Sequence, residues 1–524
     1  MSDMFAKFFK PIKIGGATAL IVITSFASYA LGLLRDRIIA VHFGTSTATD
    51  TYNASFLIPD SLFNLFIAGA LAAAFMPIFS EYLVKDKAEA HKIANTMLTT
   101  AVLAIGMLAV ISFIFMRQII NFSFPEATLT MQNDIVNMTR LMLVSAILFA
   151  ISNTLGNILM TYKHFFSYAL SPILYNLGII LGVVFLQESF GIYSAAVGVL
   201  IGGVLHCLIR IIDIKFTEYK YKPEMAVTHP GFKKIIKLMI PRTINQLAMQ
   251  VNLYLFTLIG MKLTEGAVAA FNFARNIQSF AVSLFGISFA TAVFPYLTSS
   301  ISNGDKISYT EQVQKTIQRI LFFTIPSAAG VMLLSKPLVE LILSGGMFDS
   351  KSVELTSLIL FFFAISIPFE SLSHITSRAF YAVKDTLTPM YVYIVSMVII
   401  GFCTIYVAPK YGIEWFSIGF SIGFIVFVTL TLILLKKHLE NFNFKNLFLS
   451  IGKTIISTGL MVIIVIVSQP LENILGIKIA SVLRIIIGAT SFFIVAYLLK
   501  SSEISNVNYM ISRLFKKPID EPKI

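Results

Sequence analysis

Charged residues are the scarcest class in this sequence. Only 13% of its 524 residues are charged, whereas 56% are hydrophobic. Water-soluble domains carry charge on roughly a quarter of their residues, and a soluble chain of this length would need far more polar surface to cover its core. The composition therefore excludes a soluble globular protein and indicates an integral membrane protein.

Cysteines and the motifs of enzyme chemistry are also scarce. The two cysteines, Cys207 and Cys403, lie in apolar runs, where a free thiol behaves as a small hydrophobe and no disulfide framework or metal set can be built. The sequence has no nucleotide loop of the G-x-x-x-x-G-K-[ST] type and no Ser/His/Asp arrangement in a readable context. We therefore expect no enzyme activity, no cofactor and no metal, with an ion gradient or the membrane potential as the energy source.

Basic residues outnumber acidic ones, 40 to 27, which gives a net charge of +13. They sit in short segments between apolar runs, and no basic stripe is interleaved with aromatics in a polar domain. Such bases are typical of topology signals and of contacts to anionic lipid headgroups. We therefore expect membrane lipids as partners and exclude nucleic acid.

Apolar runs long enough to cross a membrane fill most of the chain. A span needs about 20 apolar residues, and about fourteen segments meet this rule. They lie near residues 15–43, 51–84, 93–116, 140–162, 165–186, 191–211, 238–263, 266–301, 317–343, 356–383, 386–409, 413–435, 448–471 and 481–499. Lys7, Lys10 and Lys13 precede the first run, which continues without a cleavage site, so we interpret it as an uncleaved helix. The sequence predicts an all-α integral membrane protein.

The distribution of lysine and arginine predicts the orientation. With the N-terminus inside, the outside segments carry only a few basic residues, namely Arg117, Arg140, Lys262, Lys336, Lys351, Lys410 and Lys478. Most of the others fall in the inside segments, as the positive-inside rule requires. One helix more or fewer would scramble this pattern. We therefore expect an even number of spans with both termini cytoplasmic.

A weak internal repeat divides the spans into two lobes. At a shift of about 219 residues, Tyr52-Asn53 falls on Phe271-Asn272, and a second echo near Pro172 and Pro389 has nearly the same spacing. Repeats of one orientation indicate two lobes with the substrate between them, moving in alternating access. The predicted organisation is residues 1–211 for the N-terminal six-helix lobe, 212–237 for a cytoplasmic loop, 238–435 for the C-terminal six-helix lobe, 448–499 for two further helices and 500–524 for a cytoplasmic tail.

Charged residues inside the first two spans are candidates for function, because charge in the membrane is costly and usually functional. The first helix ends in Arg35-Asp36-Arg37. This triplet is either an interfacial anchor with an internal ion pair or an anion site at Arg35. Asp50 and Asp60 flank the second helix. Asp60 follows Pro59, where a broken helix would face a polar cavity, although it could equally cap the deeper helix segment.

The later spans carry further polar side chains. Pro241-Arg242 opens the seventh helix, whose Asn245, Gln246, Gln250 and Asn252 form a polar stripe. We favour helix–helix bonding for this stripe over ligand contact. The eighth helix carries Arg275 and Asn276 mid-span, where an external anion is a plausible partner for Arg275. Glu370, His374 and Arg378 follow at spacing four on the tenth helix, either as a self-neutralising ladder, which we favour, or as a proton path.

Short motifs recur along nearly the whole chain, namely Leu31-Gly-Leu-Leu-Arg35-Asp36, Phe43-Gly44, Ala48-Thr-Asp50, Ile58-Pro59, Gly69-Ala70, Ala74-Phe75-Met-Pro77, Phe166 with Pro172 and Asn176, Gln250-Val-Asn252, Glu265-Gly266, Pro295 and Arg378-Ala-Phe-Tyr-Ala-Val-Lys-Asp385-Thr-Leu-Thr-Pro389. Together they resemble the motifs of the MurJ (MviN) lipid II flippases, a family of the MOP exporter superfamily. The resemblance implies fourteen helices in two lobes. It also implies translocation of an undecaprenyl-pyrophosphate-linked peptidoglycan precursor to the outer face of the bacterial inner membrane.

The chain departs from this family at several basic and acidic positions. Tyr29, Phe63 and Ala68 stand where the family usually has an arginine, an arginine and an acid. The eighth-helix arginine of the family falls on Asn276, with Arg275 adjacent as a shifted substitute about 100° away. Arg35 alone carries over directly from the family's cavity basic set. The predicted substrate-binding set is Arg35, Asp36, Asp50, Asp60, Asn64, Arg242, Gln250, Asn252, Arg275, Asn276 and Arg378.

Three functions remain open on this evidence. The first is a lipid II flippase, since a pyrophosphate needs arginines that match its oxygens bidentately. The second is a MOP exporter of another polyprenyl-linked glycan or of a drug, which the missing arginines favour. The third is a degenerate paralogue that serves as a scaffold for cell-envelope enzymes.

Overall fold

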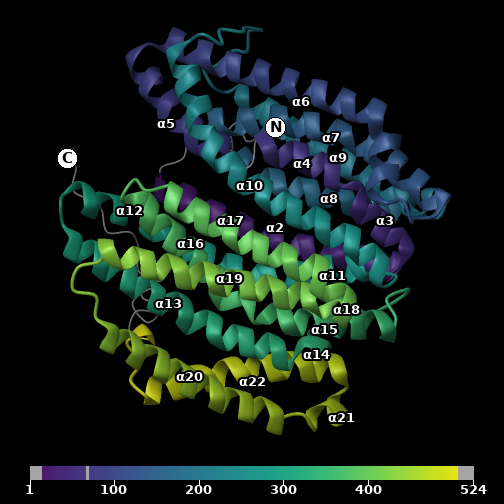
Figure 1. Ribbon diagram of the computed structural model, residues 1–524, viewed down its shortest axis with the longest axis vertical. Coiled ribbons are helices and arrows are strands. Elements are labelled where there is room, and N and C mark those ends of the chain that lie inside the picture. Colours follow the sequence, from purple (N-terminus) through teal and green to yellow (C-terminus); the bar gives the residue numbers. More distant parts are fainter. Residues whose placement is uncertain (1–13, 67–69, 505–524) are drawn as a thin grey trace, which may run out of the picture. The chain divides into compact units, whose positions relative to one another are not determined.

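The computed structural model describes residues 14–66 and 70–504, and over these ranges the chain is helical, with one isolated bridge between Gly345 and Phe348 (Figure 1). By internal packing it falls into two compact units. The first unit comprises the chain up to Phe273 with Ile342–Val353 and Thr404–Ile413. The second comprises Ala274–Leu341, Glu354–Cys403 and the chain from Glu414 onward.

The first unit contains the N-terminal helices, two of which, α8 and α9, pack through small residues. Its main elements are α2 (Ile14–Phe43), α3 (Thr47–Ser55), α4 (Leu57–Phe66), α5 (Ala70–Lys85), α6 (Lys87–Ser123), α7 (Leu129–Thr161), α8 (Phe166–Phe190), α9 (Tyr193–Ile214), α10 (Pro230–Leu263) and the first half of α11 (Ala267–Ala281). A Cβ on Gly178 would lie 2.3 Å from the Cα of Gly202, and one on Gly182 would lie 2.4 Å from the Cα of Gly198. Glycine thus lets α8 and α9 approach backbone to backbone, as membrane helices often do.

The remaining elements belong mainly to the second unit. They are the second half of α11, the π-helix η1 (Val282–Ile287), α12 (Ser288–Ser302), α13 (Lys306–Leu333), α14 (Ser335–Leu343), α15 (Ser350–Ala364), α16 (Ser366–Ala382), α17 (Leu387–Phe402), η2 (Cys403–Val407), α18 (Ala408–Tyr411), α19 (Glu414–Leu435), η3 (Lys436–His438), α20 (Phe444–Val467), α21 (Leu471–Leu475) and α22 (Ile477–Leu498). The core of this unit forms where α16 packs on α13 and α19, with Tyr309 and Phe380 fully buried.

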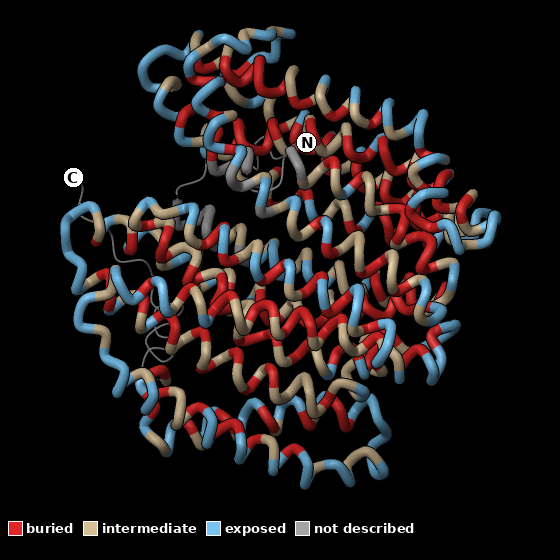
Figure 2. Tube along the Cα trace, in the orientation of Figure 1, coloured by how far each residue is buried: buried red, intermediate tan, exposed pale blue. Residues whose placement is uncertain are grey.

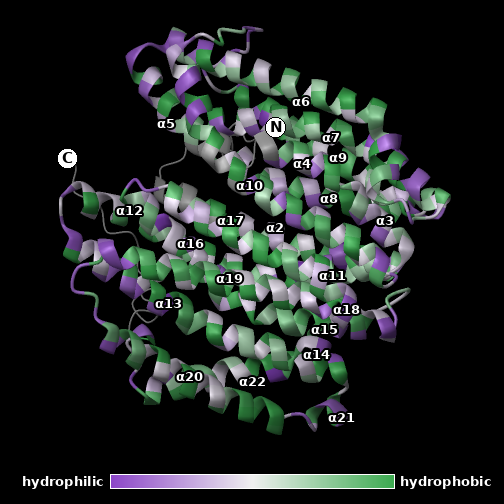
Figure 3. Cartoon of the chain, in the orientation of Figure 1, coloured by the Kyte–Doolittle hydropathy of each residue, from purple (hydrophilic) through white to green (hydrophobic). Residues whose placement is uncertain are grey.

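Many of these helices are apolar on surfaces that are not buried. In α6 the most apolar stretch has a mean hydropathy of 2.4, yet only 22% of it is buried. Phe185 and Val467 are 75% and 72% exposed. Comparing Figure 2 with Figure 3 shows exposed turns that are hydrophobic along several helices. A surface of this kind suits lipid and not water.

The all-α membrane fold predicted from the sequence is confirmed. Among the described residues ten helices are long and apolar enough to cross a membrane, and an eleventh is added if α15 and α16, bent by 45°, form one span. The count of fourteen therefore stays a prediction.

The end of the first helix and the break in the second span lie at other residues than the sequence suggested. The triplet Arg35-Asp36-Arg37 does not end the first helix, because α2 continues to Phe43. The second span is broken, as expected, but the break lies at Phe56, between α3 and α4, and Pro59 lies inside the first turn of α4. Since proline lacks a backbone N–H, the first turn of a helix tolerates it.

Candidate functional site

Arg35 is held in the first unit by side chains of two helices. Its Nε and Nη2 donate to Oδ1 of Asp36 at 3.0 and 2.7 Å, and its Nη1 donates to Oδ1 of Asn176 on α8 at 3.0 Å. The Asn176 amide nitrogen in turn donates to the carbonyls of Ser28 and Pro172. The Arg35 side chain is 23% exposed, and Asp36 is buried. The Arg35 side chain is therefore oriented by its partners and remains partly exposed.

Two tyrosines complete this group, which we call the Arg35 cluster: Arg35, Asp36, Asn176, Tyr52 and Tyr175. Both phenols interact electrostatically with the guanidinium, from α3 and α8 respectively. The sequence analysis did not select Tyr52, Tyr175 or Asn176 for the site. An asparagine in an otherwise apolar run, one turn after Pro172, was the available signal for Asn176.

Asp50 closes the N-terminus of another helix. Its carboxylate accepts hydrogen bonds from the backbone N–H groups of Gly266 and Ala269, each at 2.8 Å, where α11 begins. The exchange is reciprocal, because Glu265 accepts from the backbone N–H and the hydroxyl of Thr47, where α3 begins. Capping satisfies N–H groups that a helix start leaves open. Both carboxylate oxygens of Asp50 thus hold the start of α11 in place.

The other predicted residues of the first unit take different surroundings. Asp60 is exposed in the first turn of α4, where the helix dipole stabilises a negative charge. Its backbone carbonyl accepts a hydrogen bond from Nε2 of Gln250 at 3.1 Å. Asn252 is buried and donates to the Ala248 carbonyl on its own helix. Asn64 is half-buried on α4. The side chain of Arg242 lies outside the described residues.

In the second unit, Arg275 lies in a polar group with Glu370. Nε2 of Gln278 donates to Oε2 of Glu370 at 2.7 Å and to Oγ of Ser366 at 3.0 Å. The Arg275 charge interacts with the Glu370 carboxylate, and the Tyr393 phenol interacts with both. We call these five residues, Arg275, Gln278, Ser366, Glu370 and Tyr393, the Glu370 cluster. Asn276 is half-buried beside it on α11.

Glu370, His374 and Arg378 do not bond to one another through their side chains as a ladder would require. Arg378 donates to Oγ1 of Thr291 on α12 at 2.9 Å and to the carbonyl of His374 at 3.2 Å, while Glu370 is held by Gln278 of α11. The polar face of α16 therefore bonds to the span formed by α11, η1 and α12.

Arg210 is a buried base of the first unit, near the C-terminal end of α9. It is 2% exposed and donates to Oγ of Ser171 and to the carbonyl of Ser152. One turn later, Asp213 accepts from Ser167 and bonds His164 at 2.8 Å. These bonds join α7, α8 and α9, so Arg210 serves the packing of the unit and is not a solvated charge.

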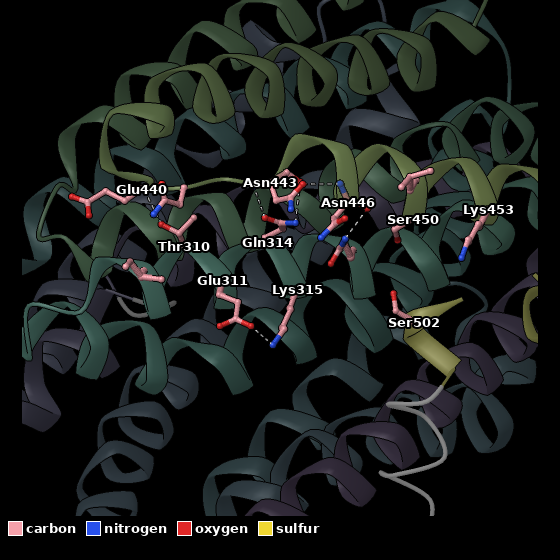
Figure 4. Close-up of a pocket in the computed structure, with 14 residues that line it drawn as sticks. Thr310, Glu311, Gln314, Lys315, Glu440, Asn443, Asn446, Ser450, Lys453 and Ser502 are labelled. Atoms are coloured by element: carbon pink, nitrogen blue, oxygen red, sulfur yellow. Dashed lines mark hydrogen bonds and ion pairs between the residues drawn. The ribbon is translucent and has the colours of Figure 1, made fainter. Parts of the chain in front are cut away.

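A polar pocket of about 530 Å³ lies in the second unit between α13 and the start of α20 (Figure 4). Its charged lining is already paired, since Lys315 bonds Glu311 and Glu440 bonds Lys306. Gln314 exchanges hydrogen bonds with the backbone of Asn443. These contacts fasten α13 to α20, and we do not include the pocket in the candidate site.

An apolar groove of about 370 Å³ lies in the same unit, between α11–η1, α13, α20 and α22. Its walls include Phe285, Phe323 and Phe493, with the Phe285 and Phe323 rings stacked at 4.9 Å. Arg484 lines it too, but it is buried and paired with Glu472. The groove can accept a hydrocarbon chain.

Comparison with known proteins agrees with this arrangement. The family model described as "Lipid II flippase MurJ" matches residues 39–486. The curated lipid II flippase MurJ of Burkholderia cenocepacia is 26% identical over 424 residues, which covers 77% of this chain and 81% of the relative.

Solved structures give the same result. One titled "Lipid II flippase MurJ, inward closed conformation" superposes with a TM-score of 0.80 at 26% identity, covering 92% of this chain and 98% of that one. An inward-facing multidrug resistance MATE transporter of the MOP superfamily shares the fold, with a TM-score of 0.65 at 17% identity, over 78% of this chain and 93% of the other. The chain therefore belongs to the lipid II flippase MurJ family, and with its many apolar helices it is a multi-pass membrane protein of the bacterial inner membrane.

Proposed function

We propose that this chain is a lipid II flippase. It would carry an undecaprenyl-pyrophosphate-linked headgroup from the inner to the outer leaflet by alternating access, without covalent chemistry. The observation that carries the proposal, beside membership of the family, is the Arg35 cluster. Within it a partly exposed arginine side chain is held by side chains of α2 and α8 inside a span.

The hydrogen bonding of Arg35 leaves room for a phosphate. A guanidinium has five N–H donors in a fixed fork. Three of its nitrogens each donate once within the cluster, which leaves two N–H groups for an oxyanion. The cluster also contains Asp36, so the resting group is close to neutral. A cation held in this way costs less inside the membrane than an unpaired one.

The lipid tail of the cargo needs a separate, apolar path. The groove lined by Phe285, Phe323 and Phe493 has the required chemistry, because its walls are almost entirely hydrocarbon and aromatic. We infer that the polyprenyl chain lies in this groove or in the lipid beside it. Burial of each CH₂ group would contribute about 0.8 kcal/mol.

Both termini and the segment around Lys233, at the start of α10, are proposed to be cytoplasmic, on the distribution of lysine and arginine. The two native cysteines are buried, so single cysteines introduced elsewhere can be labelled selectively. A membrane-impermeant maleimide applied to intact cells should label Met347→Cys, at an exposed position, and leave Lys233→Cys unmodified. Labelling at Lys233→Cys would overturn this orientation.

A second candidate cargo is a different polyprenyl-linked glycan. It is favoured by one observation, the replacement of the family's usual charged residues by Tyr29, Phe63, Ala68 and Asn276. Rescue of a bacterial cell depleted of its own lipid II flippase separates the two cargoes. We expect this chain to restore growth and cell shape. Good expression without rescue would favour the second cargo.

A further inference from the structure

Glu370 is an acid inside a predicted span of the second unit, and its surroundings give it a defined partner. Its Oε2 accepts from Nε2 of Gln278 at 2.7 Å, and the same nitrogen donates to Ser366. Membrane spans rarely keep an acid without a functional reason. The question is what this carboxylate does there.

The ionisable groups around Glu370 are few. Arg275 lies three residues before Gln278 on α11, so both side chains share one helix face, and its charge interacts with the carboxylate. Tyr393 of α17 faces both. On α16 itself, His374 and Arg378 follow one and two turns later.

The other elements packed on α16 contribute little charge near Glu370. η1 has no ionisable side chain, and α19 has only Glu414 at its first position. α12 has Tyr296, and the ionisable residues of α13 lie in the first half of that helix. The charges that act on Glu370 are therefore dominated by Arg275.

The hydrogen bond between Glu370 and Gln278 joins α16 to α11, just before α11 gives way to an irregular helix. Four residues after Gln278 the span becomes the π-helix η1, a form often found at functional sites. In η1, a Cβ on Gly286 would lie 2.6 Å from the Cα of Ser371, the residue after Glu370. Beyond η1, Thr291 accepts from Arg378. A movement of α11 against α16 would therefore lengthen the Gln278–Glu370 bond.

We propose that Glu370 is the resident counter-ion of Arg275, that the anionic headgroup of the cargo replaces it, and that the displaced carboxylate then takes up one proton. This inference rests on the proposed function. Phosphate oxygens would accept the N–H groups of Arg275, which leaves Glu370 beside a second anion. Two neighbouring anions disfavour each other, so a hydronium ion or buffer acid of the solvent gives up a proton, which forms an O–H bond at Glu370. Each bound headgroup is thereby accompanied by one proton.

The test uses the purified full chain in detergent, in a weakly buffered, sodium-free solution with a pH indicator, and farnesyl pyrophosphate as the probe. For each bound probe molecule, the wild-type chain should take up about one proton more than the Glu370→Gln variant does. Its affinity should rise as the pH falls, by up to about tenfold per pH unit for one linked proton. Glu370→Gln should bind the probe with this extra uptake and pH dependence lost.

Glu311→Gln is the matched control, because it removes an exposed acid of the same unit that pairs with Lys315. It should behave as wild type. Glu370→Asp keeps a titratable carboxyl, so it should retain proton uptake with weaker binding, which guards against a Glu370→Gln chain that does not fold. Unchanged uptake in a folded Glu370→Gln, or absent uptake in a folded Glu370→Asp, would show that another group takes the proton and leave the proposed function standing. A wild-type chain that binds farnesyl pyrophosphate no better than farnesol would overturn both.

Discussion

Each unit has one candidate site arginine inside a predicted span, Arg35 or Arg275, with an acid near it, and the two pairs are built differently. In the first unit Arg35 pairs with Asp36, the next residue of the same helix, and Asn176 of α8 adds a neutral contact. In the second unit the acid near Arg275 is Glu370, which lies on another helix and is fastened through Gln278. One pair is local in sequence and the other depends on packing.

This difference matters when helices move. Neighbours on one helix keep their distance in any rigid movement, so Asp36 stays with Arg35 throughout a transport cycle. A pair across two helices can separate, and the π-helix beside Glu370 marks where the backbone departs from regular α geometry. On this basis we propose that Arg35 is a fixed contact for an anion and that Arg275 is an exchangeable one.

The largest expected effect tests the fixed contact. Arg35→Ala removes the guanidinium of a partly exposed side chain, and hydrogen bonds to charged groups contribute about 1.5–3 kcal/mol. Affinity for farnesyl pyrophosphate should fall about 10- to 100-fold, and growth rescue should be lost at normal expression. Lys85→Ala, which removes an exposed base paired with Glu81, is the control and should have little effect. A normally active Arg35→Ala would leave Arg35 as an anchor only.

The next test separates acids that hold the fold from acids that hold a charge. Asp50→Ala leaves the N–H groups of Gly266 and Ala269 without their acceptor. The chain should lose about 2 kcal/mol of stability or more, read as a lower Tm in detergent. Probe affinity per folded molecule should stay at the wild-type value. If affinity fell while the Tm held, Asp50 would belong to the binding site.

A smaller effect is expected for the exchangeable arginine. Because the probe must first replace Glu370 at Arg275, part of the interaction that it gains offsets one that is lost, and Arg275→Ala should weaken probe binding about tenfold, close to one charged hydrogen bond. Arg275→Lys should lie between this variant and wild type, since lysine keeps the charge and loses the bidentate fork. Equal losses for Arg275→Ala and Arg275→Lys would point to shape and not charge.

The smallest effect concerns Glu265, the exposed half of the reciprocal caps. The hydroxyl of Thr47 and then its backbone N–H hold the pKa of the Glu265 carboxyl below its usual range. A lowered pKa contributes stability that is present above the unfolded-state value and is lost as the pH falls through the folded-state value. Glu265→Gln should therefore lower the Tm at neutral pH by a small amount, and this difference from wild type should disappear as the pH falls below about 4.3. A Tm difference that persisted or grew at low pH would contradict this.

The sequence predicted the class of fold, and it singled out Arg35 as a candidate, for physical reasons. Apolar runs report directly on lipid, and a charge such as Arg35 stands out within one. It could not identify Asn176 or Gln278 as partners, because periodicity fixes the face of a helix and not the neighbour that it meets. For the same reason Asp50 looked like a binding residue, whereas folding places it against the start of α11.

The hydrogen bond from Ala269 to Asp50 joins residues 219 apart, the same shift at which Tyr52 falls on Phe271. Asp50 therefore bonds to the position that is its own counterpart in the repeat. In a symmetric pair of identical half-length chains, that position would face its own copy, and two aspartates would meet at hydrogen-bond distance. A chain that carries both halves avoids this repulsion, because residue 269 can be alanine while residue 50 remains acidic. Joining the halves in one polypeptide thus permits the two helix starts to be capped by acids at different positions of the predicted repeat, Asp50 and Glu265, which two identical subunits could not provide.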